Sequence, residues 1–317
     1  MSEVVNKEKE SKKALVLLNM GGARSKDELK MFLTNMFNDE NIITVKSDFL
    51  RSIIAKFIVT SRLNSAWKNY EEIGNESPIN PLTEKLVEKL NNSLDNIFVA
   101  QAMRYTPPQA SECIKLLEEN DIKEVILLPL YPQYSTTTTK SSVEDFIEFS
   151  NNKFKIEVIE PFYKNDVFND AILDTILNTV EDYSEYNLIF SAHGLPQKIV
   201  DNGDPYQKHV QEHVEILSNK LKEKDINFKS ISLAYQSKVG PMKWLEPALD
   251  ERLKDFKDDK VLIYPIAFIV DNSETDFELS IEYKEEADEI GIKDYKVCKC
   301  VNFDDKFIDA IKDITKL

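Results

Sequence analysis

His193 is one of three histidines in this 317-residue chain, and it stands in the stretch LIFSAHGLP at residues 188–196. The apolar residues before it are typical of a buried strand, and Gly194 and Pro196 after it predict a sharp turn. In open α/β sheets, ligands bind outside the carboxyl ends of the strands. Histidine changes its charge near neutral pH, so His193 could accept a proton there. A capping or hydrogen-bonded core histidine is the structural alternative.

Three glutamates, Glu274, Glu278 and Glu282, follow the apolar run 260–270 at intervals of four residues. In a helix this spacing places their carboxylates along one side. Like charges so spaced destabilise a helix by about 0.2–0.5 kcal/mol per pair, unless cations or shared protons intervene. The stripe could therefore carry a hydrated divalent metal or protons. A solvated acidic face is the alternative, and the place of Glu274 after a strand argues against it.

Polar side chains also follow two other expected strands. Arg104 and Tyr105 come soon after the apolar run 97–102, and arginine binds a carboxylate through two parallel hydrogen bonds, which lysine does poorly. The apolar run 125–129 leads into a segment rich in tyrosine and hydroxyl side chains at 131–139. Such residues suit a flat amphipathic ligand, or a helix N-terminus that receives an anion. An exposed polar loop explains this segment equally well.

Short apolar runs alternate with helical patterns, which predicts βαβ units and mainly parallel sheets. Strands are expected at 14–18, 97–102, 125–129 and 156–159, then at 187–191, 230–235, 260–265 and 295–298. Helices are expected at 27–37, 81–94, 109–118 and from 143 onward, then at 206–221, 246–254 and 273–290. The predicted fold class is α/β, with two Rossmann-like, doubly wound domains at 13–160 and 161–302, each with a parallel four-stranded sheet. Their strand ends would face a central cleft, with an amphipathic segment at 49–73 as its wall or lip.

Composition excludes several classes of protein. The formal net charge is −16, which disfavours nucleic acid as a partner because phosphate binding needs a basic surface. The cysteines Cys113, Cys298 and Cys300 give no disulfide framework and fit a reducing compartment. The apolar runs fall far short of the ~20 residues of a membrane helix, and the first residues lack the apolar core of a secretory signal. We therefore expect a cytoplasmic protein, with peripheral membrane contact left open.

Eight short strings, in order over nearly the whole chain, resemble ferrochelatase, the protoporphyrin and coproporphyrin ferrochelatase family of the class II chelatases. They are NMGG, the SP of IGNESP, AMRY, LPLYPQYS, FSAHGLP, GDPY, AYQSKVGPMKWL, and PIAF with DNSET. The resemblance implies insertion of Fe2+ into protoporphyrin IX to give haem, the terminal step of haem biosynthesis, with iron as a substrate and no nucleotide or organic cofactor. It also implies a C-terminal helix, at 303–317, that packs back toward the first domain.

The same strings carry the family's site residues. His193 matches the active-site histidine, which accepts a pyrrole proton or contacts the metal, and Glu274 matches the catalytic glutamate across the macrocycle, so both are candidate metal contacts. Asp271, Glu278 and Glu282 would relay protons or metal. Six residues fall in strings that line the porphyrin pocket or hold its propionates: Met20, Tyr70, Ser77, Arg104, Tyr105 and Trp244. Metal insertion removes two N–H protons and desolvates a cation, so it needs a base, a carboxylate relay and a rigid apolar slot.

One position departs from the family pattern. Many relatives have histidine where this chain has Asn272, and an amide cannot accept a proton near neutral pH. His193 is then the remaining imidazole of the site. His209 and His213 stand four residues apart, a spacing that suits a metal, but without a third ligand we expect them on the surface. The cysteines that hold an iron–sulfur cluster in some relatives are absent, so we expect no cluster.

Other functions predict different features. A chelatase that places cobalt or nickel in another tetrapyrrole would keep the cleft, the histidine and the acidic helix, but would lack the AMRY, YPQYS and SKVGP strings together. A non-enzymatic tetrapyrrole carrier would bind porphyrin without turnover and would not need both His193 and Glu274. The chain has no GxGxxG turn for a dinucleotide and no GxSxG elbow for a serine hydrolase. The choice between protoporphyrin and coproporphyrin, the oligomeric state and the iron donor stay open.

Overall fold

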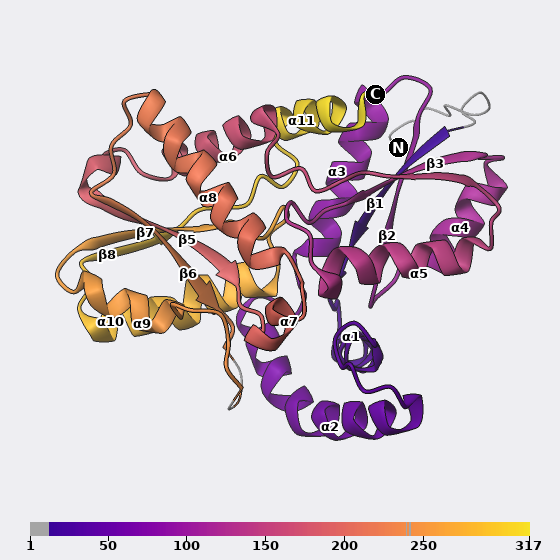
Figure 1. Cartoon of the computed structure of the whole chain (residues 1–317), viewed down its shortest axis with the longest axis horizontal. Helices are drawn as coiled ribbons and strands as arrows, with labels where there is room; N and C mark the ends of the chain where they lie inside the picture. Colours follow the sequence, from indigo (N-terminus) through magenta and orange to yellow (C-terminus); the bar gives the residue numbers. More distant parts are fainter. Residues whose placement is uncertain (1–12, 239, 241) are drawn as a thin grey trace.

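The computed structural model describes residues 13–238, 240 and 242–317. The chain folds around two four-stranded parallel sheets (Figure 1). The first contains β1 (Lys13–Asn19), β2 (Phe98–Met103), β3 (Glu124–Pro129) and β4 (Lys155–Val158), in the order β2-β1-β3-β4. The second contains β5 (Tyr186–His193), β6 (Ser230–Gln236), β7 (Lys260–Pro265) and β8 (Asp294–Val297), in the order β6-β5-β7-β8. The predicted fold class is confirmed. The expectation that the first residues form no secretory signal lies outside the described residues.

The central strands are apolar because side chains cover both of their faces. In β1, Leu15 and Leu17 belong to one core cluster, whereas Val16 and Leu18 belong to another. Successive side chains of a strand point to opposite faces of the sheet, so the two clusters lie on opposite sides of it. The first cluster also contains Phe190 of β5. One hydrophobic core is therefore shared by the two sheets.

Helices cover both faces of each sheet. In the first half they are α1 (Lys26–Asn38), α2 (Asp48–Glu72), α3 (Ile79–Ser93), α4 (Ala110–Glu119), η1 (Thr136–Lys140) and α5 (Ser141–Ser150). In the second half they are α6 (Asp166–Thr179), α7 (Gln197–Asp201), α8 (Tyr206–Glu223), α9 (Leu249–Leu253), η4 (Glu274–Glu282), α10 (Tyr283–Ile290) and α11 (Asp305–Thr315). Two single 3₁₀ turns, η2 (Tyr183–Glu185) and η3 (Lys254–Phe256), complete the set. None of these described helices is long and apolar enough to cross a membrane.

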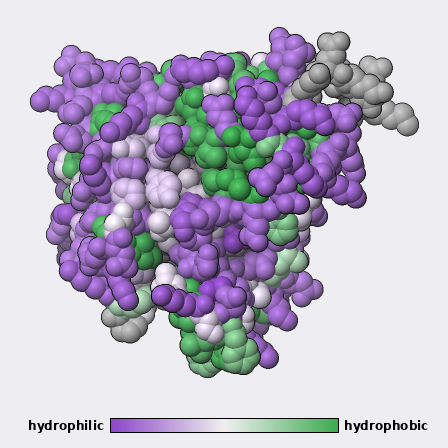
Figure 2. Space-filling view, turned by 45° about the vertical axis from the view of Figure 1, so that its right-hand side comes forward, coloured by the Kyte–Doolittle hydropathy of each residue, from purple (hydrophilic) through white to green (hydrophobic). Residues whose placement is uncertain are grey.

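The long helix α2 extends along one end of the molecule, beside α1 (Figure 1). The hydroxyl of Ser47 accepts a hydrogen bond from the Leu50 N–H and so caps the helix. Ala55 and Val59 are buried against the rest of the chain, whereas Phe57 is 77% exposed. Hydrophobic side chains are visible at this end of the surface (Figure 2). One side of the helix is therefore buried, whereas apolar side chains near its start are exposed to solvent.

Three helices differ from the prediction. Residues 273–290 are helical as expected, but they form a π-helix, η4, followed by the α-helix α10. Helix α9 begins at Leu249 rather than at residue 246, because Pro247 has no N–H to donate and restricts the residue before it. Helix α6 was not among the expected elements. Its sequence has an N-cap signal in Asn165, whose side chain accepts from the Phe168 N–H.

A π-helix occurs at the same place in both halves. η1 follows β3 and leads into α5, and η4 follows β7 and leads into α10. β3 and β7 occupy the same position in their sheets. The two halves thus share a strand order and a rare helical turn at the end of the equivalent strand.

Helix α11 lies against both α6 and α3 (Figure 1). Lys89 of α3 donates to the Phe303 carbonyl oxygen at 3.0 Å and to Asp305 at 2.7 Å. Phe307 is fully buried, with its ring centroid 5.8 Å from that of Phe168. The C-terminal helix therefore contacts elements of both halves, while the domain boundaries at 160 and 302 stay predictions.

Candidate active site

His193 is the last residue of β5, at the carboxyl edge of the second sheet. The next residue, Gly194, donates its N–H to the Gln236 carbonyl oxygen on β6 at 2.8 Å. A Cβ atom on Gly194 would lie 2.7 Å from that oxygen, so a larger residue would collide with the backbone. The Tyr206 hydroxyl donates to the His193 carbonyl oxygen at 2.9 Å. The backbone that carries the imidazole is therefore held from both sides.

Glu274 begins η4, which follows the neighbouring strand β7. Its Oε2 atom lies 3.8 Å from Nε2 of His193, and the two side chains are 32% and 36% exposed. An imidazole and a carboxylate taken from two distant motifs thus face each other at one sheet edge. Their partial exposure leaves room for a ligand to approach both.

Glu278 lies next to Glu274 along η4. The Ser237 hydroxyl donates to its carboxylate, with 2.6 Å between Oγ and Oε2. Burial, and then the negative charge of Glu274, raise the pKa of Glu278 to about 7. This carboxyl group can therefore hold or release a proton near neutral pH, beside the pair of His193 and Glu274.

Gln236 and Ser237, which the sequence did not single out, also belong to the site. The Gln236 side-chain nitrogen lies 3.4 Å from Oε2 of both Glu274 and Glu278. These two residues directly follow the expected strand at 230–235, which corresponds to β6, the neighbour of β5. The rule that drew attention to His193, polar residues at a strand end, would have found them too.

Tyr70, near the end of α2, brings the first half to the site. Its side chain is buried and hydrogen-bonds with Ser273, the residue before Glu274. Burial raises the pKa of Tyr70, so its hydroxyl keeps its proton. Trp67 stacks on Tyr70 with ring centroids 6.1 Å apart. The predicted pocket residue Tyr70 thus lies beside the predicted catalytic glutamate.

Trp244 lies against the loop that follows His193. It pairs with Pro196 in an isolated antiparallel bridge, and its Cε3 atom would be 3.4 Å from a Cβ atom on Gly194. The residue is partly exposed. It can therefore offer an apolar surface close to the loop that follows His193.

Met20 and Ser77 lie on the first half. Met20 follows β1 and is partly exposed, and its carbonyl oxygen accepts from the Tyr105 N–H at 3.0 Å. Ser77 is 1% exposed, and its Cβ and Oγ atoms would lie 2.5 Å from a Cβ atom on Gly22. Met20 is thus open to a ligand, whereas Ser77 packs closely against the chain itself.

Arg104 binds carboxylates, but those in this structure belong to the protein. Its guanidinium lies 2.8 Å from Asp145 and 3.2 Å from Asp39, and its Nε donates to Ser141 Oγ at 2.8 Å. The fully buried Tyr105 donates its hydroxyl to Asp39 at 2.9 Å. Arg104 and Tyr105 therefore tie the end of β2 to neighbouring helices, and a contact of either with a propionate remains a prediction.

The three predicted relay residues have different surroundings. Asp271 is buried and accepts from the Cys300 N–H at 3.0 Å and the Asn302 amide at 2.9 Å, so its carboxylate holds the segment after β8. Glu282 is exposed at the end of η4. Glu278 is the relay candidate that adjoins Glu274.

Asn272 caps the π-helix. Its side-chain oxygen accepts from the Glu274 N–H at 2.8 Å, and its own N–H donates to Thr275 Oγ1 at 2.9 Å. Asparagine is among the preferred residues for this task. The residue that departs from the family pattern thus has a local structural role, which its place before Ser-Glu-Thr could have indicated.

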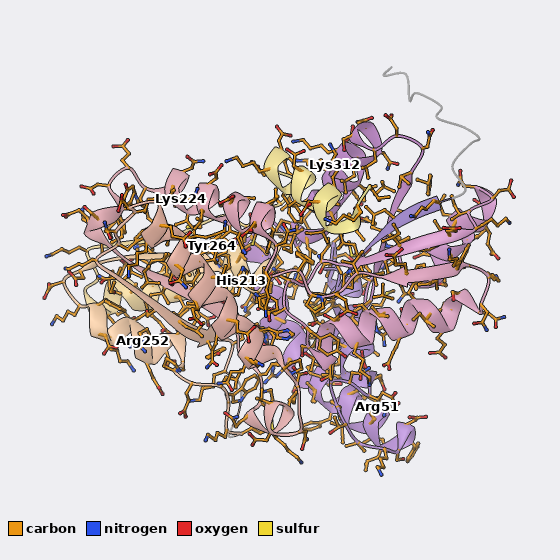
Figure 3. All side chains as sticks on the ribbon, turned by 45° about the horizontal axis from the view of Figure 1, so that its top comes forward. Arg51, His213, Lys224, Arg252, Tyr264 and Lys312 are labelled. Atoms are coloured by element: carbon orange, nitrogen blue, oxygen red, sulfur yellow. The ribbon has the colours of Figure 1, made fainter. Side chains whose placement is uncertain are left out.

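The prediction that His209 and His213 are surface residues is wrong for His213, which is fully buried near the centre of the molecule (Figure 3). Its two ring nitrogens lie 2.8 Å from the Gln133 amide nitrogen and 2.8 Å from the Asn169 side-chain oxygen. Burial lowers the pKa of His213 to about 3, so the ring is neutral. His209 accepts from the Tyr134 N–H at 3.2 Å. In the part of the chain that the structure describes, His209 and His213 belong to no metal-binding group of three or more histidine, cysteine or acidic side chains.

The hydroxyl-rich segment receives an anion, and that anion is Asp204. The buried Asp204 Oδ2 accepts from Ser135 Oγ at 3.0 Å, the Thr136 N–H at 2.7 Å and Thr136 Oγ1 at 2.6 Å. Its other oxygen accepts from the Tyr206 N–H at 2.9 Å. An anion at this helix N-terminus was one of the interpretations of the segment, and here a carboxylate of the second half takes that place and joins the two halves.

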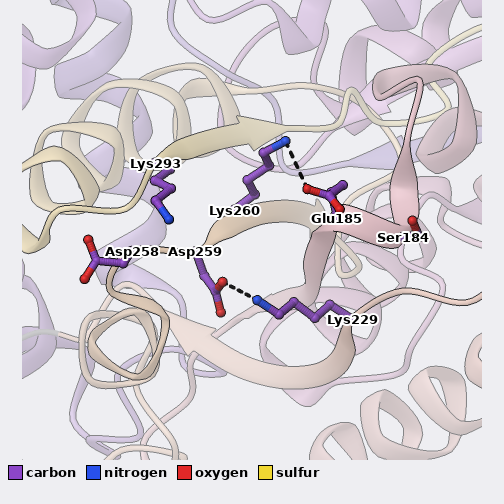
Figure 4. Close-up of a pocket in the computed structure, with 7 residues that line it drawn as sticks. All are labelled: Ser184, Glu185, Lys229, Asp258, Asp259, Lys260 and Lys293. Atoms are coloured by element: carbon purple, nitrogen blue, oxygen red, sulfur yellow. Dashed lines mark hydrogen bonds and ion pairs between the residues drawn. The ribbon is translucent and has the colours of Figure 1, made fainter.

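A separate polar pocket lies at the amino edge of the second sheet (Figure 4), whereas His193 ends β5 at the carboxyl edge. Its walls carry Lys229 paired with Asp259, and Lys260 at 3.6 Å from Glu185. Its lysines and carboxylates largely neutralise one another, and it contains none of the predicted site residues.

Comparisons with known proteins agree with the motifs. The ferrochelatase family model matches residues 12–317. A ferrochelatase of Sulfurimonas denitrificans is 52% identical over 309 residues, covering 96% of this chain and 98% of that one; one of Helicobacter pylori HPAG1 is 43% identical, covering 98% and 95%. Among solved structures, SirB from Bacillus subtilis with Fe3+ superposes with a TM-score of 0.59 at 12% identity, covering 96% of this chain and 94% of that one, which supports the fold alone. The resemblance inferred from the sequence is confirmed.

Proposed function

Because this chain belongs to the ferrochelatase family, enzymes that insert Fe2+ into a porphyrin, we propose that its porphyrin is protoporphyrin IX and that His193 and Glu274 carry out the chemistry. The family assignment makes the protein a lyase of haem biosynthesis with iron and porphyrin as substrates. The observation that carries the residue roles is the 3.8 Å approach of His193 Nε2 and Glu274 Oε2 at the carboxyl edge of the second sheet.

Insertion replaces two pyrrole N–H bonds by bonds to iron and releases two protons. We propose that His193 accepts the first proton, because imidazole is the commonest general base in enzymes and this one lies partly exposed at the sheet edge beside Glu274. The carboxylates of Glu274 and Glu278 are suited to take the second, since the pKa of Glu278, raised by burial and by Glu274, is about 7. Carboxylate oxygens and an imidazole nitrogen are also ligands that Fe2+ accepts while it loses its water.

The macrocycle would lie between the two halves, against the partly exposed Met20 and Trp244 and close to Tyr70. Arg104, Tyr105 and Ser77 would shape this cleft through their packing and hydrogen bonds in the first half. A residual relay role for Asp271 and Glu282 stays a proposal, supported by sequence position more than by contact with Glu274.

No resident cofactor enters this proposal. All three cysteines are buried single thiols, and burial raises the pKa of Cys113 and Cys298 to about 12, which disfavours the thiolates that a cluster needs. Metal analysis of purified protein should find less than one equivalent of iron and no labile sulfide.

We also propose a cytoplasmic location, in line with three unpaired cysteines. Peripheral membrane contact is a further proposal, and its support is the apolar side of α2, where Phe49 and Phe57 are each 77% exposed. Co-sedimentation with lipid vesicles, wild type against a Phe49→Ser, Phe57→Ser double variant, tests it.

The deciding experiment mixes the protein anaerobically with Fe2+ and protoporphyrin IX and follows the loss of porphyrin fluorescence. Wild type should turn over, and His193→Ala should bind porphyrin without turning it over. His209→Ala is the matched control, because it removes an imidazole outside the site. A parallel assay with coproporphyrin III tests the choice of porphyrin, and porphyrin binding without turnover by wild type would instead indicate a carrier.

A further inference from the structure

Gln236 links His193 to the carboxylates of the site. Its carbonyl oxygen accepts from the Gly194 N–H, which fixes the loop after His193. Its side-chain oxygen accepts from the Ser191 hydroxyl at 2.7 Å, and that bond turns the amide nitrogen toward the carboxylates. Gln236 is fully buried, so its amide orientation has little freedom. One residue thus contacts both sides of the proposed catalytic pair.

Ser237, the next residue, has an unusual backbone conformation that serves the same contact. Its φ angle is +67°, in the left-handed region that residues other than glycine and asparagine seldom adopt. In this conformation its hydroxyl lies 2.6 and 2.9 Å from the two carboxylate oxygens of Glu278, and 3.5 Å from Oε2 of Glu274. Backbone strain of this kind persists where the surroundings hold it in place.

Two neighbouring carboxylates repel each other, and their side chains can rotate away from each other into water. Within the described part of the chain, Ser237 donates its one hydroxyl proton to Glu278, and the two N–H groups of the Gln236 amide face Glu274 and Glu278 at 3.4 Å each. These donors offset the repulsion, with Gln236 holding Glu274 in the direction of His193 and Ser237 holding Glu278 beside it.

We infer that Gln236 and Ser237 are positioning residues for iron insertion, which hold the carboxylates of Glu274 and Glu278 in place facing His193 so that they can receive the metal. The inference rests on the proposed function for its role in turnover, but the positioning itself concerns the binding of metal. Neither residue needs to touch the porphyrin.

Gln236→Ala tests the first contact. Loss of the amide should lower kcat by about ten- to a hundredfold, because a misplacement of the order of 1 Å suffices for such an effect. The KM for Fe2+ should rise at the same time, while the affinity for protoporphyrin IX, from fluorescence titration, should change less than about twofold. Ser232→Ala is the matched control, since this β6 residue has a buried hydroxyl with no hydrogen-bond partner. A Gln236→Ala enzyme with wild-type kcat and wild-type KM for Fe2+ would overturn the inference.

A glycine and an asparagine at position 237 separate the hydroxyl from the backbone. Ser237→Gly keeps the positive φ without strain but removes the donor, so it should lose activity as Ser237→Ala does. Ser237→Asn tolerates the same φ and restores a donor, so it should recover part of the rate. Wild-type activity in Ser237→Gly would show that the backbone alone matters and would remove Ser237 from the proposal.

Calorimetric titration with Fe2+ alone, without porphyrin and without oxygen, makes the test independent of turnover. Wild type should bind the ion, and Gln236→Ala should bind it at least about tenfold more weakly, with an unchanged melting temperature in the Ser232→Ala control. If wild type failed to metalate porphyrin yet this difference held, the proposed function would fall and the positioning role would stand. Equal Fe2+ affinity in wild type and Gln236→Ala would remove the positioning role, whatever the turnover.

Discussion

The pKa of a buried side chain depends on its surroundings, and Glu278 shows this most clearly. An ordinary glutamate titrates near 4.3, whereas burial and Glu274 raise the pKa of Glu278 to about 7. Between these two values the folded protein binds the proton and the unfolded chain does not. The group therefore contributes stability that is present at low pH and is lost as the pH rises through 7.

The first prediction follows from this loss of stability with rising pH. Glu278→Gln should raise the melting temperature at pH 8, by the equivalent of about 1 kcal/mol once partial exposure is allowed for, and should change it little at pH 5. Differential scanning calorimetry at both pH values measures this. Glu282→Gln is the control, since that side chain is exposed in the same helix. A stabilisation of equal size at both pH values would contradict the prediction.

The buried His213 has the opposite sign. Burial lowers its pKa to about 3, below the value near 6.5 of an unfolded chain, so protons favour the unfolded state as the pH falls below ~6.5. His213→Leu should cost about 1–3 kcal/mol at pH 7, because the amides of Gln133 and Asn169 lose their partner. It should also lose less stability than wild type between pH 7 and pH 5. Urea unfolding at the two pH values checks both statements, and an equal pH dependence would refute the second.

For single residues, the sequence could predict the candidate catalytic side chains but not the contacts that hold side chains in place. His193 and Glu274 each follow an apolar run, and parallel strands bring such positions to one edge. The partners of Arg104 could not be predicted, because Asp39 is distant in sequence and its side-chain direction depends on the packing of α1. The burial of His213 was equally hidden, since its two hydrogen-bond partners come from other elements.

Among the elements, η4 depends on its cap. Asn272→Ala removes the side-chain oxygen that binds the Glu274 N–H, which should cost about 1 kcal/mol of stability and lower kcat by displacing Glu274. Asn272→Asp keeps the acceptor and should be close to wild type in stability. Melting temperature and anaerobic turnover of the variants measure these effects. Asn272→His would decide whether this position lacks a proton acceptor or serves as a helix cap. A gain in rate would support the missing acceptor, and a loss of rate would support the cap.

The strands were predictable because both of their faces are buried, which gives short apolar runs that a sequence displays directly. The π-helix was not, because glutamates four residues apart fit one side of an α-helix as well as a π-helix. What distinguishes the two is the backbone hydrogen bonding, which joins residues five apart in a π-helix and four apart in an α-helix, and side-chain spacing does not reveal it.

In the whole molecule, Asp204 joins the two halves. Asp204→Asn should weaken the acceptor of Ser135 and Thr136 and lower stability by about 1–3 kcal/mol. A weaker contact between the two halves should also raise the KM for porphyrin more than it lowers kcat. Denaturant unfolding and steady-state kinetics test this, with Asp201→Asn on the exposed helix α7 as control. Equal effects of the two substitutions would show that the contact does not couple the halves.

The division into two sheets was visible in the sequence as two series of alternating runs, but the sharing of one core was not. Leu15, Phe168, Phe190 and Phe307 belong to one cluster although they come from both halves and from α11. An apolar pattern shows that a face is buried without showing which partner covers it. The core that the two halves share could therefore be found only from the packing in the structure.

The repeated π-helix has a consequence for how such a site can arise. The two halves present equivalent edges, after β3 and after β7, yet the first is filled by Asp204 and the second is lined by Glu274 beside His193. In a symmetric dimer of identical chains every substitution appears at both edges, so one edge could not become a joint while the other stayed open to a ligand. Fusing two copies into one polypeptide removes that constraint, and each copy is then free to diverge.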